Sequence, residues 1–92
     1  MAARFALGRL LATPGALRAL EVAGVLPFAL LARHHGGEWG DLSPEDHRAN
    51  DRALRDGSRL FSAYVLPTGV QVWVITEAEP RAATTLLLPE EY

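Results

Sequence analysis

The chain has 92 residues, of which 49% are hydrophobic, a length that fits one domain with a single modest core. It contains no cysteine, which excludes disulfides, a thiolate nucleophile and a cysteine-ligated zinc site. A formal net charge of −2 argues against binding to nucleic acid through its phosphates, because such domains are usually strongly basic. With no apolar run long enough to span a bilayer, we expect a cytoplasmic domain over residues 1–92 that binds neither membrane nor cofactor.

The first segment with a pattern is FALGRLLA, residues 5–12. Its alternation is imperfect and a glycine interrupts it, so a short edge strand and a loose helical lead-in both remain open. The pair Thr13-Pro14 is a clearer signal, because threonine caps a helix and proline fits its first position. This predicts a helix that ends at Ala23 before Gly24, with Leu17 and Leu20 facing inward.

Two further helices are predicted from the same kinds of start and stop residues. Residues 27–35, PFALLARHH, begin with proline and end at a Gly-Gly pair, which puts His34 and His35 in the last turn. There the helix dipole favours their protonated form. Residues 44–56 follow the cap Ser43, start with proline and two acids, and end before Gly57.

From residue 59 the period changes to the alternation of strands, over residues 59–66, 70–78 and 83–88. A two-residue Thr68-Gly69 loop is assumed for the first hairpin, although a three-residue loop of Pro67, Thr68 and Gly69 would change how the side chains are sorted between the faces. This register gathers Ser62, Tyr64, Gln71, Trp73 and Glu77 on one face, opposite Phe61, Ala63, Val65, Val72 and Val74. The predicted fold is α+β: about three helices within residues 13–56, on one face of a three- to four-stranded antiparallel sheet whose C-terminal β-meander spans 59–89.

The stretch RHHGGEWGD, residues 33–41, is a candidate site. Imidazole titrates near neutral pH, so His34 or His35 could serve as a general acid or base oriented by Glu38. The simpler interpretation, which we favour, is that both histidines cap a helix end. For Trp39 we similarly expect packing in the core rather than a role as an exposed interaction anchor.

Two other groups of residues have weaker support as functional sites. A metal could be held by His34 or His35 with Glu38, His47 and Asp51, but the last two, four residues apart on one helix, are more simply a local charge contact, so we expect no metal. A set of polar residue types found in small metal-independent ribonucleases is also present, namely Arg59, Ser62, Tyr64, Thr76, Thr84 and Thr85. Threonine and serine suit strands in any case.

ATPGAL, RHHGGEWGD, GSRLFSAY, VWVITEAE and ATTLLLPEEY together resemble a family of small uncharacterised proteins encoded on bacterial plasmids and integrative elements, over about residues 5–92. In that family the loop reads roughly His-x-x-Gly-acid-Trp-Gly. This maps onto His34, Gly37, Glu38, Trp39 and Gly40, and makes His34 the position to test. The chain departs from the family at Glu79-Pro80-Arg81, where an Asp-Arg pair is common. The family is similar in setting to proteins encoded near antirestriction and other counter-defence genes.

The sequence and the resemblance together leave two candidate functions. The first is a non-catalytic protein-binding module of a mobile genetic element, such as an anti-CRISPR or antirestriction factor, that docks on a host protein or protein complex. Its expected binding residues are Tyr64, Trp73, Trp39, Glu77 and Tyr92. The alternative is a small metal-independent ribonuclease-like enzyme that uses His34 with Arg59 and Tyr64. The high apolar content is also compatible with a homodimer.

Overall fold

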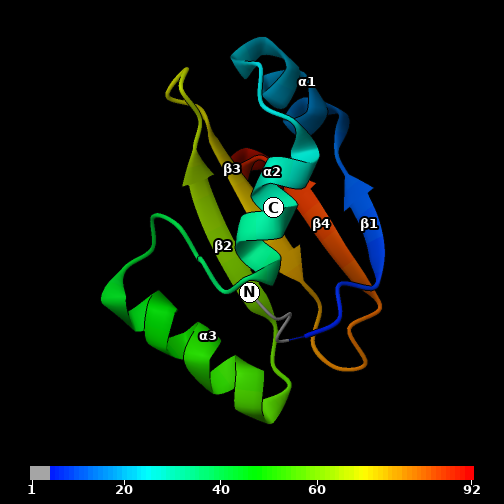
Figure 1. Cartoon of the computed structure of the whole chain (residues 1–92), viewed down its shortest axis with the longest axis vertical. Helices are drawn as coiled ribbons and strands as arrows, with labels where there is room; N and C mark the ends of the chain where they lie inside the picture. Colours follow the sequence, from blue (N-terminus) through cyan, green and yellow to red (C-terminus); the bar gives the residue numbers. More distant parts are fainter. Residues whose placement is uncertain (1–4) are drawn as a thin grey trace.

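The computed structural model describes residues 5–92 and has the predicted α+β fold, with helices packed on a four-stranded sheet (Figure 1). Along the chain the elements are β1 (Arg9–Ala12), α1 (Pro14–Ala23), α2 (Pro27–His35), α3 (Pro44–Asp56), β2 (Leu60–Val65), β3 (Gln71–Thr76), β4 (Ala83–Leu87) and a 3₁₀ turn, η1 (Pro89–Glu91). Among the described residues no single helix could cross a membrane; α1 and α2 together have the length and composition, but they meet at a bend of 104°.

The sheet has the strand order β1-β4-β3-β2. The C-terminal strands form the predicted antiparallel meander. Residues 9–12 form an edge strand, which decides between the two interpretations of that segment, and they run parallel to β4. The sheet is therefore mixed rather than wholly antiparallel, because the chain reaches β4 only after crossing over through the helices.

The helix ends are as the local sequence predicted. Thr13 and Ser43 accept hydrogen bonds from the backbone N–H groups of Ala16 and Asp46, and helices α1 and α3 stop at glycines with positive φ. The predicted inward face of α1 is confirmed for Leu20 but is wrong for Leu17. Leu20 is buried, but Leu17 is 47% exposed, since α1 touches the rest of the protein through the narrow side that carries Ala16 and Leu20.

The predicted register of the first hairpin was wrong. Strands β2 and β3 pair from Leu60 with Thr76 to Val65 with Gln71, so residues 66–70 form a five-residue loop. Leu66 N–H donates to Val70 O at 2.8 Å within that loop. The slip of one residue turns every side chain of β3 to the other face relative to β2. Tyr64 and Trp73, expected side by side, therefore lie on opposite faces of the sheet.

Helix α2 lies across one face of the sheet in Figure 1, with α1 at one end of this face and α3 alongside β2. The main core lies beneath α1 and α2; its buried members are Ala16, Leu20, Leu30, Leu31, Tyr64, Leu66, Val72, Val74 and Leu86. A smaller core beside α3 contains Trp39, Ala53 and Leu60. The opposite face of the sheet, which we call the open face, carries no α-helix from residues 5–92, and the C-terminal turn η1 lies behind the sheet in this view.

The outer edge of β2 is closed by residues from other elements. The side chain of Asn50, on α3, accepts from Phe61 N–H at 3.0 Å and donates to Phe61 O at 2.6 Å. One step further along, Ala63 N–H donates to Trp39 O, and Ala63 O accepts from Asp41 N–H. Between those two contacts Gly40 has φ 80°, and a Cβ there would lie 2.1 Å from Ala63 O, so this close approach requires glycine.

We expect Asn50→Ala to lower the free energy of unfolding by about 2–3 kcal/mol, because it leaves the buried side of the Phe61 peptide without a donor and an acceptor. Urea unfolding followed by tryptophan fluorescence measures this loss. The neighbouring exposed Asp51 provides the matched control, and Asp51→Ala should change stability by no more than about 0.5 kcal/mol. Equal effects of the two substitutions would contradict the role given to Asn50.

Candidate functional site

His34 is fully buried and sits in a chain of hydrogen bonds that crosses the sheet. Its Nδ1 lies 2.6 Å from Ser62 Oγ, and its Nε2 lies 2.9 Å from Thr76 Oγ1. Thr76 Oγ1 is in turn 2.7 Å from Thr84 Oγ1, and Thr84 donates to the carbonyl of Leu7 at 2.7 Å. The network thus ties α2, β2, β3, β4 and the lead-in to β1 at one point.

The network fixes a proton on Nε2 of His34. A carbonyl only accepts, so Thr84 must give its one proton to Leu7, and Thr76 must then donate to Thr84. Thr76 therefore accepts from Nε2–H, and in the neutral ring Nδ1 accepts from the Ser62 hydroxyl. Every member is satisfied when the imidazole is neutral with its proton on Nε2.

The surroundings of His34 favour the same neutral form. Burial, reinforced by the nearby charges of His35 and Arg81, lowers the pKa of His34 from 6.5 to about 4. This overturns the expectation that the helix dipole favours its protonated form, because loss of hydration outweighs the dipole for a ring with no solvent contact. A ring with both nitrogens engaged and no exposed atom is a structural group of the core.

The rest of the RHHGGEWGD loop is also held by packing. His35 Nε2 lies 2.9 Å from the carbonyl of Phe5, so His35 secures the lead-in to β1 rather than capping its own helix. Trp39 is only 4% exposed and stacks on Phe5, with ring centroids 6.2 Å apart. The interpretation of Trp39 as a core residue is confirmed, and its place among the binding residues was wrong.

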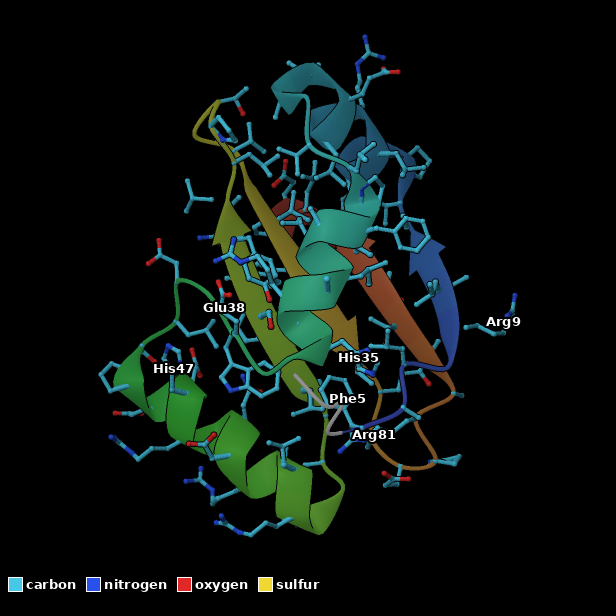
Figure 2. All side chains as sticks on the ribbon, viewed as in Figure 1. Phe5, Arg9, His35, Glu38, His47 and Arg81 are labelled. Atoms are coloured by element: carbon cyan, nitrogen blue, oxygen red, sulfur yellow. The ribbon has the colours of Figure 1, made fainter. Side chains whose placement is uncertain are left out.

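An open cleft of about 540 Å³ borders this loop, between β2 and the start of α3. In it the Arg33 guanidinium lies 4.5 Å from the centroid of the Tyr64 ring, and its Nε donates to Glu38 at 2.6 Å. Figure 2 shows Glu38 and His47 on the same side of the molecule, beside the first turn of α3. Both charged groups of the Arg33–Glu38 pair are thus already engaged with each other at the rim.

The proposed metal ligands do not assemble. Within residues 5–92, no group of three or more histidine, aspartate or glutamate side chains could hold a metal ion. Both nitrogens of His34 are engaged with Ser62 and Thr76, and Glu38 pairs with Arg33. Glu38 and His47 border the same cleft, but they are not joined there by a third ligand as that hypothesis required.

The three residues of the enzymatic alternative are not brought into one cleft either. Tyr64 is 1% exposed, it donates to Glu38 O at 2.6 Å, and burial raises its pKa to about 12. His34 belongs to the buried side of α2 and Tyr64 lies beneath that helix, whereas the Arg59 guanidinium lies over the Phe61 and Tyr92 rings on the open face. The sheet separates the cation from the imidazole, so a phosphodiester could not contact both.

The open face carries a group of aromatic side chains joined by one arginine, which we call the aromatic cluster: Arg59, Phe61, Trp73 and Tyr92. Phe61 and Trp73 meet edge to face with centroids 4.9 Å apart, and Trp73 and Tyr92 do so at 5.6 Å. Arg59 Nη1 donates to the Tyr92 hydroxyl at 3.0 Å, while Tyr92 remains 71% exposed. Glu77, just beyond β3, is exposed as well.

Of the predicted binding residues, then, Trp73 and Tyr92 meet in one cluster, and Tyr64 and Trp39 are buried elsewhere. The prediction of Tyr64 as an exposed anchor was wrong because the slipped register turned it toward α2. Phe61 was not predicted as a member of the cluster for the same reason, because the assumed register placed it on the apolar face together with Val72 and Val74.

A buried arginine, Arg81, was also missed. It is 3% exposed, and its guanidinium donates to the carbonyls of Ser58, Glu77 and Ala53 at 2.9, 3.0 and 3.1 Å. Figure 2 shows it beside Phe5 and His35. An arginine in a hairpin turn is normally expected to be exposed to solvent. Nothing in the local sequence around Arg81 indicated that its side chain is buried.

No family model, curated protein or solved structure matches this chain.

Proposed function

We propose that this protein is a protein-binding module that docks its partner through the aromatic cluster on the open face of its sheet. The single observation that carries this proposal is the composition of that surface: Trp73, Tyr92, Phe61 and Arg59 in mutual contact, with none of the α-helices of the described chain covering them. Tryptophan, tyrosine and arginine supply most of the binding energy in measured protein interfaces.

The chemistry of the cluster suits a partner with an apolar anchor flanked by acceptors. The aromatic rings offer rigid surface that loses little conformational entropy on binding. The Arg59 guanidinium has donors left beyond its bond to Tyr92, which a carbonyl or carboxylate at the rim of the partner can accept. A convex protein segment with one apolar side chain next to such an acceptor therefore fits.

The biological setting we propose is counter-defence by a mobile genetic element, with a host defence protein or complex as the partner. It rests on the resemblance of RHHGGEWGD and the flanking segments to proteins encoded on plasmids and integrative elements. The test is the transfer of an unmodified plasmid into restricting or CRISPR-bearing bacteria that express the protein. Transfer should rise in those hosts and stay unchanged in a host lacking the defence system; no rise in any defended host would remove this setting.

We expect the double substitution Arg59→Ala and Tyr92→Ala to weaken partner binding by about a hundredfold or more, because it removes two anchors of the kind that each contribute 2 kcal/mol or more. The partner is first isolated by nuclease-treated affinity purification from a defence-bearing host and identified by mass spectrometry. Binding of the purified pair is then measured by calorimetry.

The matched control is Phe28→Ala, which removes an equally exposed aromatic side chain, 71% exposed, from α2 on the other face of the sheet. It should leave the affinity unchanged. A partner that binds the double variant as tightly as the wild type, or loses affinity with Phe28→Ala instead, would remove the aromatic cluster from the proposal.

A further inference from the structure

The two edges of the sheet differ in what covers them. Along β2 the outward-facing peptide groups of Phe61 and Ala63 are bonded to Asn50 and to the backbone of Trp39 and Asp41. The next outward position after Val65 is a proline, which has no N–H group. Most of this edge is therefore closed to another strand, and Val65 is left as one isolated outward residue without a backbone partner among the described residues.

The β1 edge carries no such cover among residues 5–92. Arg9 N–H donates to Ala82 O and Thr13 N–H to Leu86 O, so odd-numbered residues of β1 face β4. Leu10 and Ala12 therefore direct their N–H and C=O groups outward. The edge is also apolar, with Leu10 and Leu11 46% and 41% exposed. Figure 1 shows β1 at the rim of the sheet, with α1 and α2 set back from it.

We propose that β1 pairs with β1 of a second copy of this chain, in antiparallel orientation, to form a homodimer with one continuous eight-stranded sheet. The outward peptide groups fix the register: Leu10 pairs with Ala12 of the second copy and Ala12 with its Leu10, which makes four backbone hydrogen bonds. Leu11 then stands opposite Leu11 of the second copy, at the closer of the two spacings found in antiparallel pairs.

Charge complementarity at the ends of this strand pair supports a second copy as the occupant. The same register places Arg9 opposite Thr13 of the second copy, and in each chain Thr13 donates to Glu91 Oε1 at 2.6 Å. Arg9 is exposed and points away from the fold in Figure 2, with no ion pair among the described residues. Each Arg9 thus comes next to the Glu91 carboxylate of the other chain, and the two-fold axis makes this contact twice.

In this dimer the two open faces lie side by side and form one larger surface. The two-fold axis of an antiparallel strand pair is perpendicular to the sheet, so both aromatic clusters lie on the same side of the continuous sheet. The pairing itself depends on β1 and Glu91 alone, and it stands whether or not the aromatic cluster binds a partner.

The first test is the molar mass of the full chain by size-exclusion chromatography with light scattering, at increasing concentration. The wild type should approach twice the monomer mass of 10.0 kDa. Leu11→Lys, which sets like charges directly opposite each other on an exposed strand, should weaken association by about tenfold or more. Val65→Lys, at the closed edge, should not. A wild type that stays monomeric, or a Leu11→Lys variant that dimerises fully, overturns the proposal.

The second test uses charge reversal to check the register. Arg9→Glu places two acids together and Glu91→Arg two bases, so each variant alone should associate more weakly than the wild type by about tenfold or more. Mixed together, the two variants restore both ion pairs and should form a one-to-one heterodimer, detectable with a mass tag on one of them. If the mixture associates no better than either variant alone, Arg9 and Glu91 do not meet, and the proposed pairing is overturned even where the wild type is a dimer.

Discussion

Replacement of Arg81 by methionine is expected to lower the free energy of unfolding by about 3–5 kcal/mol, because three hydrogen bonds from a charged donor are lost and each contributes on the order of 1.5 kcal/mol. The guanidinium bonds three carbonyl groups, of which Ala53 O belongs to the last turn of α3, Ser58 O to the segment that leads into β2, and Glu77 O to the β3–β4 connection. Methionine fills the space of the aliphatic stem but removes the charged donor from all three carbonyls, of which Ala53 O keeps only its hydrogen bond from Gly57 N–H. Urea unfolding at constant pH measures the difference.

Glu79 provides the matched control for Arg81. Its Oε2 lies 3.1 Å from Arg81 Nε, yet Nε makes no hydrogen bond and the Glu79 side chain is 64% exposed. We regard this contact as a solvent-screened charge pair, and we expect Glu79→Gln to cost less than about 1 kcal/mol. If Glu79→Gln costs as much as Arg81→Met, the ion pair rather than the carbonyl bonds holds this turn.

The wild-type protein should lose stability as the pH falls below the ordinary pKa of histidine. His34 has a pKa of about 4 in the folded state and 6.5 otherwise, so the unfolded chain binds the proton first. The loss begins near the upper value and levels off below the lower one. Between about pH 7.5 and about pH 5 this one group should cost about 2 kcal/mol of the free energy of unfolding.

The comparison with His34→Gln isolates that contribution, because every other ionisable group is common to the two proteins. The variant should be less stable at about pH 7.5, since glutamine cannot satisfy both Ser62 and Thr76 in the same geometry. Its stability should fall by about 2 kcal/mol less than that of the wild type over the same pH range. Parallel pH profiles for the two proteins would show that His34 is not held neutral by the fold.

The sequence by itself determined the local features of this protein. Thr13, Ser43, Gly24 and Gly57 mark the helix ends because capping involves groups only a few residues apart, which a short stretch of sequence contains in full. The alternation after residue 59 likewise identified the meander. These signals were sufficient for the α+β fold class.

The tertiary structure alone decided the candidate site. A shift of one residue in the pairing register of β2 and β3 separated Tyr64 from Trp73 and assembled the aromatic cluster from Phe61, Trp73 and Tyr92. The neutral state of His34 depends on Ser62 and Thr76, which lie 28 and 42 residues away along the chain, and the burial of Arg81 depends on Ala53, 28 residues away. Burial and pairing across such separations are set by how the elements pack, and the free energy of packing does not belong to any one segment of the chain.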